Sequence, residues 1–153
     1  MFDPFNKLKT NYNFYIFLPT IFIFTSIFPI SSLPIKLIPI YHPHKFTTLN
    51  KYINAERTNK FMAAKIKREE TEIARLYFIG KTFKTPCKIK FTWLVCDKRS
   101  DLDNIAYAKK YILDGMYKAG AIPNDGMKYI QGFTDEFKIN DYWGVEIEIE
   151  EIS

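Results

Sequence analysis

Hydrophobic and polar residues alternate in three segments of the chain, which is the pattern of strands with one buried and one solvated face. The first segment, residues 34–41, reads PIKLIPIY, and its Pro39 favours a sheet edge because proline lacks a backbone N–H. The second segment occupies residues 89–95 and the third residues 145–149. Glutamates fill the alternate positions of the third segment, so we interpret them as a solvated row and not as metal ligands.

Two other segments carry apolar residues at helical spacing. The first helix is expected to reach about Phe78, with Thr58 or Asn59 as its N-cap. The second is expected to start near Asn104 and to run to about Lys118, before a glycine that suits a helix C-terminus. The positions expected to face the core are Phe61, Ala64, Ile73, Leu76 and Tyr77 in the first helix, and Ile105, Ala108, Ile112, Met116 and Ala119 in the second.

Turn residues separate these elements and set their order. Residues 121–133, AIPNDGMKYIQGF, predict a turn into a short strand, and Asn140 with Asp141 predicts another turn. The order strand, helix, strand, helix, strand, strand predicts the α/β (α+β) class. We expect a single domain with a small mixed β-sheet packed against two main helices, which a chain of 153 residues can build.

The N-terminal part of the chain follows a different pattern. Residues 10–35 contain no charged side chain and are long and apolar enough for a membrane span. Three prolines within them would break or kink a helix, and no signal-peptide cleavage site is evident. A poor membrane anchor, a loose hydrophobic extension and an upstream stretch outside the working domain stay open. We favour the last two over anchoring, and divide the chain into an extension, residues 1–34, and a domain, residues 35–153.

Cysteines and histidines supply no clear ligand set. Cys87 and Cys96 flank the second strand, whose nine residues span roughly 30 Å, too far for a disulfide. We expect free thiols in a reducing compartment, and therefore a cytoplasmic protein. His42 and His44 flank a proline in a loop. A metal pair is one interpretation of these histidines, and two solvated side chains is the one we favour.

Charge is distributed unevenly along the chain. Residues 36–99 hold fifteen Lys or Arg against five Asp or Glu, whereas residues 100–153 hold five against eleven. This balance fits a polyanion-binding surface beside a carboxylate site, and it also fits a protein with two ordinary faces. The candidates for contact with nucleic-acid phosphates are Arg57, Lys60, Lys65, Lys67, Arg68, Lys98 and Arg99.

Three aspartates bracket the second helix. Asp101 and Asp103 precede it, and Asp125 follows where the chain should have turned back. Carboxylates brought together in this way are costly to hold unless a cation neutralises them. On an extended segment Asp101 and Asp103 would point the same way, and their hard oxygens suit Mg²⁺ or Mn²⁺. The alternative is that these residues only cap the helix and form the turn.

A lysine on this helix is a candidate for stabilising a phosphoryl transition state. Lys110 lies seven residues after Asp103 and therefore on nearly the same helical face, whereas Lys109 is about 100° away. Lys110 is also placed to form a surface ladder with Asp114 and Lys118. Spacing alone does not decide between these roles.

Residues 99–125, RSDLDNIAYAKKYILDGMYKAGAIPND, resemble the signature of the RusA-like Holliday junction resolvases, which are common in phages and prophages. That signature has the form D-x-D-N, a helix with a lysine, (L/F)-D-(A/G)-(L/M)-x-x-A-G and an acidic turn. The likeness extends to LNKYINAER at 49–57 and GFTDEF at 132–137, and so covers about residues 35–153. Residues 1–34 have no counterpart in the family.

The resemblance implies a small homodimeric, Mg²⁺-dependent endonuclease without a small-molecule cofactor. Such enzymes bind four-way DNA junctions and nick two opposed strands, which implies a nucleoid-associated protein. Carried onto this sequence, the metal-binding and catalytic carboxylates are Asp101, Asp103 and Asp125. The essential lysine is Lys110 when aligned from the LDG side, and counting from DLDN leaves Lys109 open. The alternative function is a non-catalytic protein that binds junctions or other DNA through the same basic surface.

Overall fold

The computed structural model describes residues 35–40 and 44–152 of the chain, and the side chains from residue 44 onward. The predictions made for the hydrophobic extension, and for His42, fall outside these residues. The division of the chain at residue 34 stays a prediction. The described part is an α+β fold, as the sequence predicted.

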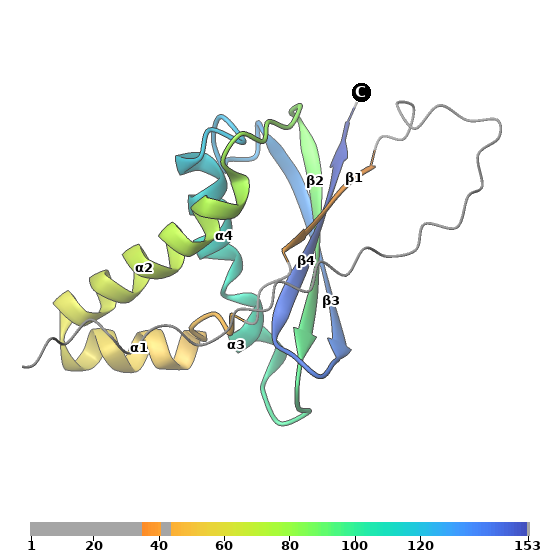
Figure 1. Ribbon diagram of the computed structural model, residues 1–153. Helices are drawn as coiled ribbons and strands as arrows, with labels where there is room; N and C mark the ends of the chain where they lie inside the picture. The colour runs from red at the N-terminus through yellow and green to blue at the C-terminus, as the bar shows by residue number, and fades with distance from the viewer. Residues whose placement is uncertain (1–34, 41–43, 153) are drawn as a thin grey trace, which may run out of the picture. The chain divides into compact units, whose positions relative to one another are not determined.

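A mixed four-stranded sheet forms one layer of the domain, in the order β1-β4-β2-β3 (Figure 1). β4 is antiparallel to both β1 and β2, whereas β2 and β3 are parallel. Parallel neighbours need a long crossover, and here α3 and α4 supply it. β1 lies at an edge, as its proline predicted. The strands are β1 (Ile35–Ile40), β2 (Cys87–Val95), β3 (Ile130–Ile139) and β4 (Gly144–Glu151).

Helices cover one face of this sheet. They are α1 (Leu49–Thr58), α2 (Lys60–Phe78), α3 (Leu102–Ala106) and α4 (Lys109–Lys118). The C-terminal half of α2 and all of α4 lie against the sheet, while α1 and the N-terminal half of α2 form a hairpin that extends away from it (Figure 1). The two main helices predicted from the sequence correspond to α2 and to α3 with α4.

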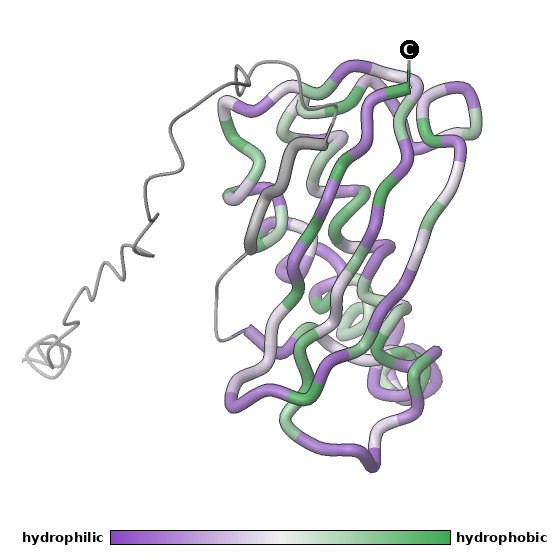
Figure 2. Tube along the Cα trace, turned by 90° about the vertical axis from the view of Figure 1, so that its right-hand side faces the viewer, coloured by the Kyte–Doolittle hydropathy of each residue, from purple (hydrophilic) through white to green (hydrophobic). Residues whose placement is uncertain are grey.

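The core lies between the sheet and these helices. Ile147 and Ile149 of β4 are fully buried, as their alternation with glutamates predicted. Burial of each such side chain contributes about 1.5–3 kcal/mol. On the open face Lys90 contacts Glu136 and Glu148 at 3.1 and 3.7 Å, so part of the glutamate row pairs with a lysine across the strands. Figure 2 shows the alternation of hydrophobic and hydrophilic residues along the strands.

Two helix predictions were wrong in detail. The sequence predicted no helix at Leu49–Thr58, where the structure has α1. It predicted one helix from Asn104 to Lys118, which the structure divides into α3 and α4. At the division Lys110 N–H donates to the Tyr107 carbonyl, a tight i to i−3 bond. The Tyr107 ring there packs between other tyrosine rings, which favours this local change in helical path.

The buried face of α2 also differs from the prediction. Phe61 is 86% exposed and Leu76 is 57% exposed, although both were expected in the core. α2 instead turns Ala74 toward α4, which approaches closely at Gly115. A Cβ at Gly115 would lie 2.7 Å from the Cβ of Ala74. The buried residues of α2 are Ala63, Glu70, Thr71, Ala74 and Phe78.

Glu70 is a buried acid that ties α2 to the segment before α1. Its carboxylate accepts hydrogen bonds from Thr47 N–H at 3.0 Å and from Thr47 Oγ1 at 2.5 Å. Its other oxygen lies 2.6 Å from His44 Nε2. Burial raises the pKa of Glu70, but the hydrogen bonds and charge of His44, together with Thr47, outweigh it and leave the pKa below 4.5. His44 thus pairs with an acid, and the metal-pair interpretation gains no support.

Two predictions about chemistry and location can be compared with the described residues. Cys87 and Cys96 are free thiols, as predicted. No helix within residues 44–152 combines the length and apolarity needed to cross a membrane. Nearly all of the uncharged N-terminal stretch lies before these residues.

Candidate active site

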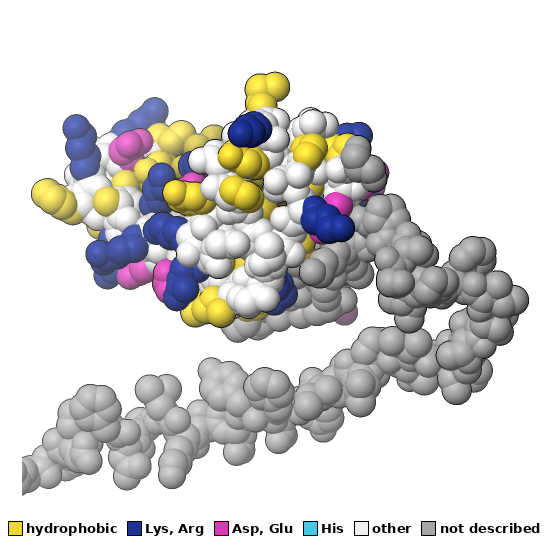
Figure 3. All heavy atoms as spheres, turned by 90° about the horizontal axis from the view of Figure 1, so that it is seen from above, with side chains coloured by type: hydrophobic (Ala, Val, Ile, Leu, Met, Phe, Trp, Pro, Cys, Tyr) yellow, Lys and Arg dark blue, Asp and Glu magenta, His cyan; other side chains and the backbone are white. Residues whose placement is uncertain are grey.

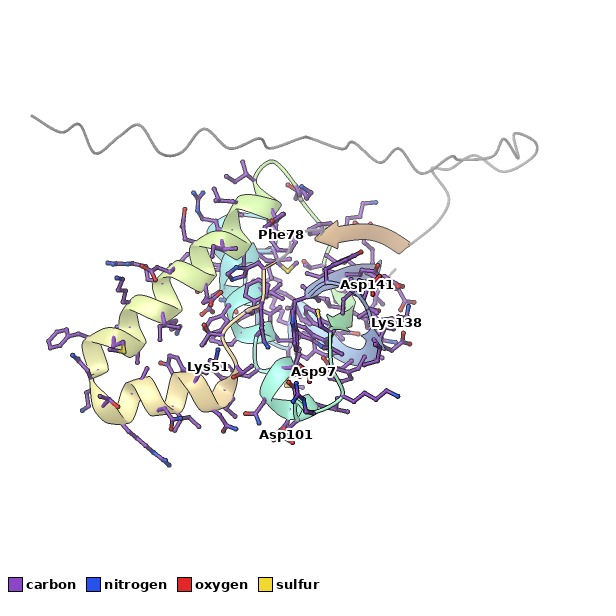
Figure 4. The ribbon with its side chains drawn as sticks, turned by 60° about the horizontal axis from the view of Figure 1, so that its bottom comes forward. Lys51, Phe78, Asp97, Asp101, Lys138 and Asp141 are labelled. Carbon is purple, nitrogen blue, oxygen red and sulfur yellow. The ribbon has the colours of Figure 1, made fainter. Side chains whose placement is uncertain are left out.

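Asp101 and Asp103 lie at the start of α3, just after β2. Asp101 is the N-cap of α3 and has extended backbone angles, whereas Asp103 is already within the first helical turn. The condition under which both side chains would point the same way, an extended segment, is therefore not met, and i, i+2 side chains at a helix start do not face the same way. Both aspartates are exposed, and neither forms an ion pair within residues 44–152. Figure 4 shows Asp97 and Asp101 at the same end of the domain, next to α3.

Asn104 connects this acidic segment to the hairpin. Its side-chain amide donates to Asp101 Oδ2 at 3.1 Å, and its Oδ1 accepts from the backbone N–H of Asn50 at 3.2 Å. The start of α1 therefore lies beside the start of α3. These bonds set the direction in which the hairpin leaves the acidic site. Nothing in the local pattern of the sequence predicted a contact between residues so far apart.

Asp125 folds back onto the first turn of α4. Lys110 Nζ donates to Asp125 Oδ2 at 3.3 Å and to Asp114 Oδ1 at 2.7 Å. Lys67 of α2 lies 3.5 Å from the other oxygen of Asp114. The predicted pairing of Lys110 with Asp114 is confirmed, but the further partner of Asp114 is Lys67 and not Lys118. Lys110 thus contacts both an acid of its own helix and one of the three bracketing aspartates.

These contacts fix the charge of Lys110. The hydrogen bond to Asp114, followed by the charges of Asp114 and Asp125, raises the pKa of Lys110 above its usual 10.5, although burial works against this. The ammonium therefore stays protonated at neutral pH. Lys110 is suited to stabilise negative charge and not to accept a proton.

Lys109 points to a different part of the domain. Its Nζ lies 2.5 Å from Asp135 Oδ2, and Trp93 Nε1 donates to the other oxygen of Asp135 at 2.8 Å. This network ties α4 to β2 and β3. The two neighbouring lysines therefore have different partners, because Lys109 contacts Asp135 of the sheet and Lys110 contacts Asp114 and Asp125.

The described residues bring some of the predicted site together and not the rest. Asp125 and Lys110 are in contact, and Asp101 and Asp103 lie two residues apart, but no ion pair or hydrogen bond joins the two groups. Within residues 44–152 no cluster of three His, Cys, Asp or Glu side chains is arranged to hold a metal ion. Asn50 and the Trp93–Asp135 pair are the neighbours of the site that sequence spacing did not identify.

Basic side chains surround the hairpin end of the domain. All seven predicted phosphate contacts are exposed. Lys65 and Lys67 have acidic partners at 3.8 and 3.5 Å, while the other five form no ion pair among the described residues. Figure 3 shows Lys and Arg side chains gathered around the end where α1 and α2 meet. Lys98 and Arg99 lie instead in the loop that leads from β2 to Asp101.

No protein-family model matches the chain, and no curated protein matches it.

Proposed function

We propose that the protein is a structure-specific DNA endonuclease that resolves four-way junctions by metal-dependent phosphodiester hydrolysis. The observation that carries the proposal is the arrangement at the start of α3 and α4. There two exposed aspartates, which have no cationic partner among residues 44–152, precede the Lys110–Asp125 contact at the foot of a basic hairpin. The resemblance of residues 99–125 to the resolvase signature supports the same interpretation.

The proposed metal ligands are Asp101, Asp103 and Asp125. Mg²⁺ binds proteins through one or two carboxylates and completes its shell with water and substrate phosphate, so Asp101 and Asp103 have suitable chemistry. Their exposure and lack of ion pairs leave carboxylate oxygens available. A bound Mg²⁺ or Mn²⁺ would activate water and stabilise the leaving oxygen. Asp125 would join this set once Lys110 releases it.

The proposed role of Lys110 is electrostatic. Its raised pKa keeps the ammonium charged at the pH of the cell. Contact with a scissile phosphate would let this charge offset the negative charge that develops on the phosphoryl oxygens. Asn104 holds Asp101 by a hydrogen bond and so orients the acidic segment.

DNA would be bound through phosphates. Arg57, Lys60 and Arg68 lie exposed on the hairpin without an ion pair to any described residue. Lys98 and Arg99 lie in the loop next to Asp101. Such contacts do not read base sequence, so recognition would rest on the shape of the branched DNA. A homodimer with two-fold symmetry would present equal sites to two opposed strands, which suits paired nicks.

A cleavage assay tests this proposal. The full chain is incubated with a synthetic four-way junction, in parallel with a linear duplex of the same length, with and without Mg²⁺. We expect symmetric nicks in two opposed strands of the junction, only with the metal present. Equal cutting of junction and duplex, or cutting that persists in excess chelator, would contradict the proposed activity.

A second candidate is a DNA-binding protein without catalysis. It is favoured by the exposed basic side chains alone, which require no acidic site. Such a protein would bind the junction with a steep dependence on salt, because phosphate contacts release counterions. It would leave the DNA intact in both Mg²⁺ and Mn²⁺, which distinguishes it from the endonuclease.

A further inference from the structure

The tip of the α1–α2 hairpin presents an apolar side chain to solvent. Phe61 is 86% exposed and the adjacent Met62 is 48% exposed, while Ala63, one residue further, is buried. A phenylalanine left in water forgoes about 1.5–3 kcal/mol of burial, so this placement needs a reason. Figure 1 shows the corner between α1 and α2 as the part of the described domain farthest from the sheet.

The backbone at this tip is well ordered by hydrogen bonds. Asn59 N–H donates to the carbonyl of Ala55 at 2.8 Å and so closes α1. The Asn59 side chain accepts from the N–H of Phe61 at 2.9 Å and so caps α2. One residue thus ends the first helix and begins the second. Phe61 is therefore held in the first turn of a capped helix, and its ring is exposed to solvent there.

The charges around Phe61 indicate the class of partner. Arg57 and Lys60 flank it and form no ion pair among the described residues, and Lys65 reaches its acid only at 3.8 Å. A second copy of the chain would bring the same positive charges together, which is unfavourable. An anionic partner with flat apolar surfaces fits better. Nucleic acid offers both, through its phosphates and the faces of its bases.

The foot of the hairpin lies at the acidic segment. The bond between Asn50 N–H and Asn104 places the start of α1 next to α3. The ten residues of α1 then extend about 15 Å to the tip. A DNA strand advances about 3.4 Å per nucleotide, so about four or five nucleotides would link the two places.

We propose that Phe61 stacks on an unpaired or unstacked base at the branch point of junction DNA, and that the hairpin tip distinguishes branched from linear DNA. The inference rests on the proposed function, since it assigns the branched-DNA selectivity of that site to a named side chain. Base pairs within a duplex arm are stacked on both faces, whereas this continuous stacking is interrupted at a branch point. Flanking lysine and arginine side chains would hold the adjacent phosphates.

Binding measurements on the full chain test this inference. Phe61→Ala, Phe61→Trp and the wild type are compared on a four-way junction and on a linear duplex, in Ca²⁺ or without metal to prevent cleavage. Base stacking on an aromatic ring is worth about 1–3 kcal/mol, so Phe61→Ala should weaken junction binding about 5- to 150-fold and duplex binding less than twofold. Phe61→Trp should retain junction binding. Leu76→Ala, which removes another exposed apolar side chain of α2, should change neither.

Several outcomes would overturn the inference. Wild-type junction affinity in Phe61→Ala, or equal losses on junction and duplex, would remove the stacking role while leaving the nuclease proposal intact. A smaller sedimenting mass for Phe61→Ala than for the wild type would assign Phe61 to an interface between copies. Failure of the wild type to prefer junctions over duplex would instead count against both this inference and the proposed function.

Discussion

Lys109 and Lys110 are neighbours in sequence with different partners in space. Lys110 contacts Asp114 and Asp125, whereas Lys109 contacts Asp135 next to Trp93. Helical phase predicted that only Lys110 shares a face with Asp103. The contact with Asp125 could not be predicted from spacing, because it depends on how the chain turns back after α4.

Substitution of each lysine by methionine separates the two roles. Lys110→Met should slow single-turnover junction cleavage by about 100- to 1,000-fold, because one transition-state contact is lost. Lys109→Met should keep cleavage within a few-fold and lower the free energy of unfolding by about 1 kcal/mol, through loss of its bond to Asp135. Cleavage is measured on a labelled junction and unfolding in urea. The reverse pattern would show that the essential lysine is Lys109.

The pH dependence of the free energy of unfolding tests the role of the Glu70 carboxylate. Its pKa is held below 4.5 in the folded protein, so it contributes stability that is present above its unfolded pKa and is lost as pH falls through the folded pKa. Glu70→Gln keeps the shape but removes the charge, and should lower the free energy of unfolding at pH 7 by about 1 kcal/mol. The difference in the free energy of unfolding between wild type and variant should shrink as the pH falls through the lowered folded pKa, because the wild type then loses the same charge. A deficit that stays constant from pH 7 to pH 3 would contradict this account.

At the residue scale the sequence identified individual groups but few of their partners. The aspartates, Lys110 and the exposed basic residues were recognised from spacing and charge. Sequence spacing offered no reason to single out Glu70, because its partner His44 lies 26 residues away. Such pairs depend on which face of a helix is buried, and that is decided by packing.

The close approach of α2 and α4 determines the shape of the helical layer. Gly115 permits it, since an added Cβ would lie 2.7 Å from Ala74 Cβ and 2.8 Å from Arg75 N. α2 therefore buries Ala74 against α4, while Leu76, two residues further, is 57% exposed, contrary to the apolar periodicity. Hydrophobic periodicity identifies a helix and its approximate length. A close helix–helix contact at a glycine changes which side of that helix is buried.

A glycine-to-alanine pair tests this contact. Gly115→Ala forces either α2 or α4 to move and should lower the free energy of unfolding by about 1–3 kcal/mol, despite alanine's higher helix propensity. Gly132→Ala in β3 is the control, because nothing lies within 4 Å of its Cβ position. Thermal unfolding midpoints of both variants report the difference. Equal midpoints would mean that the helices do not approach as closely as described.

At the element scale the strands were the most predictable part. β1, β2 and β4 occur where alternation placed them, and the edge position of β1 follows from its proline. The break between α3 and α4 was not predicted, because apolar spacing continues through it from Ile105 to Ile112. Tyrosine packing around Tyr107, which brings in Tyr52 from α1, shapes the chain there.

The whole molecule separates a scaffold from two charged regions. The mixed sheet and α4 form a core that positions the acidic segment after β2 and the turn carrying Asp125. The basic hairpin extends from that segment through the Asn50–Asn104 bond. The uneven charge along the sequence thus corresponds to two neighbouring regions in space. The acidic segment lies at the foot of the basic α1–α2 hairpin. The α+β class was predictable from element order, whereas this arrangement required the fold.

Substitution of Asp103 tests the central claim most directly. Asp103→Asn and the control Asp141→Asn, an exposed aspartate in the β3–β4 turn (Figure 4), are compared with the wild type for cleavage and binding of a four-way junction in Mg²⁺. Asp103→Asn should reduce cleavage by about 100-fold or more while junction binding without metal stays intact, since a metal-ligating oxygen is lost but no phosphate contact is. Asp141→Asn should cut like the wild type. Cleavage by Asp103→Asn at the wild-type rate would contradict the proposed active site.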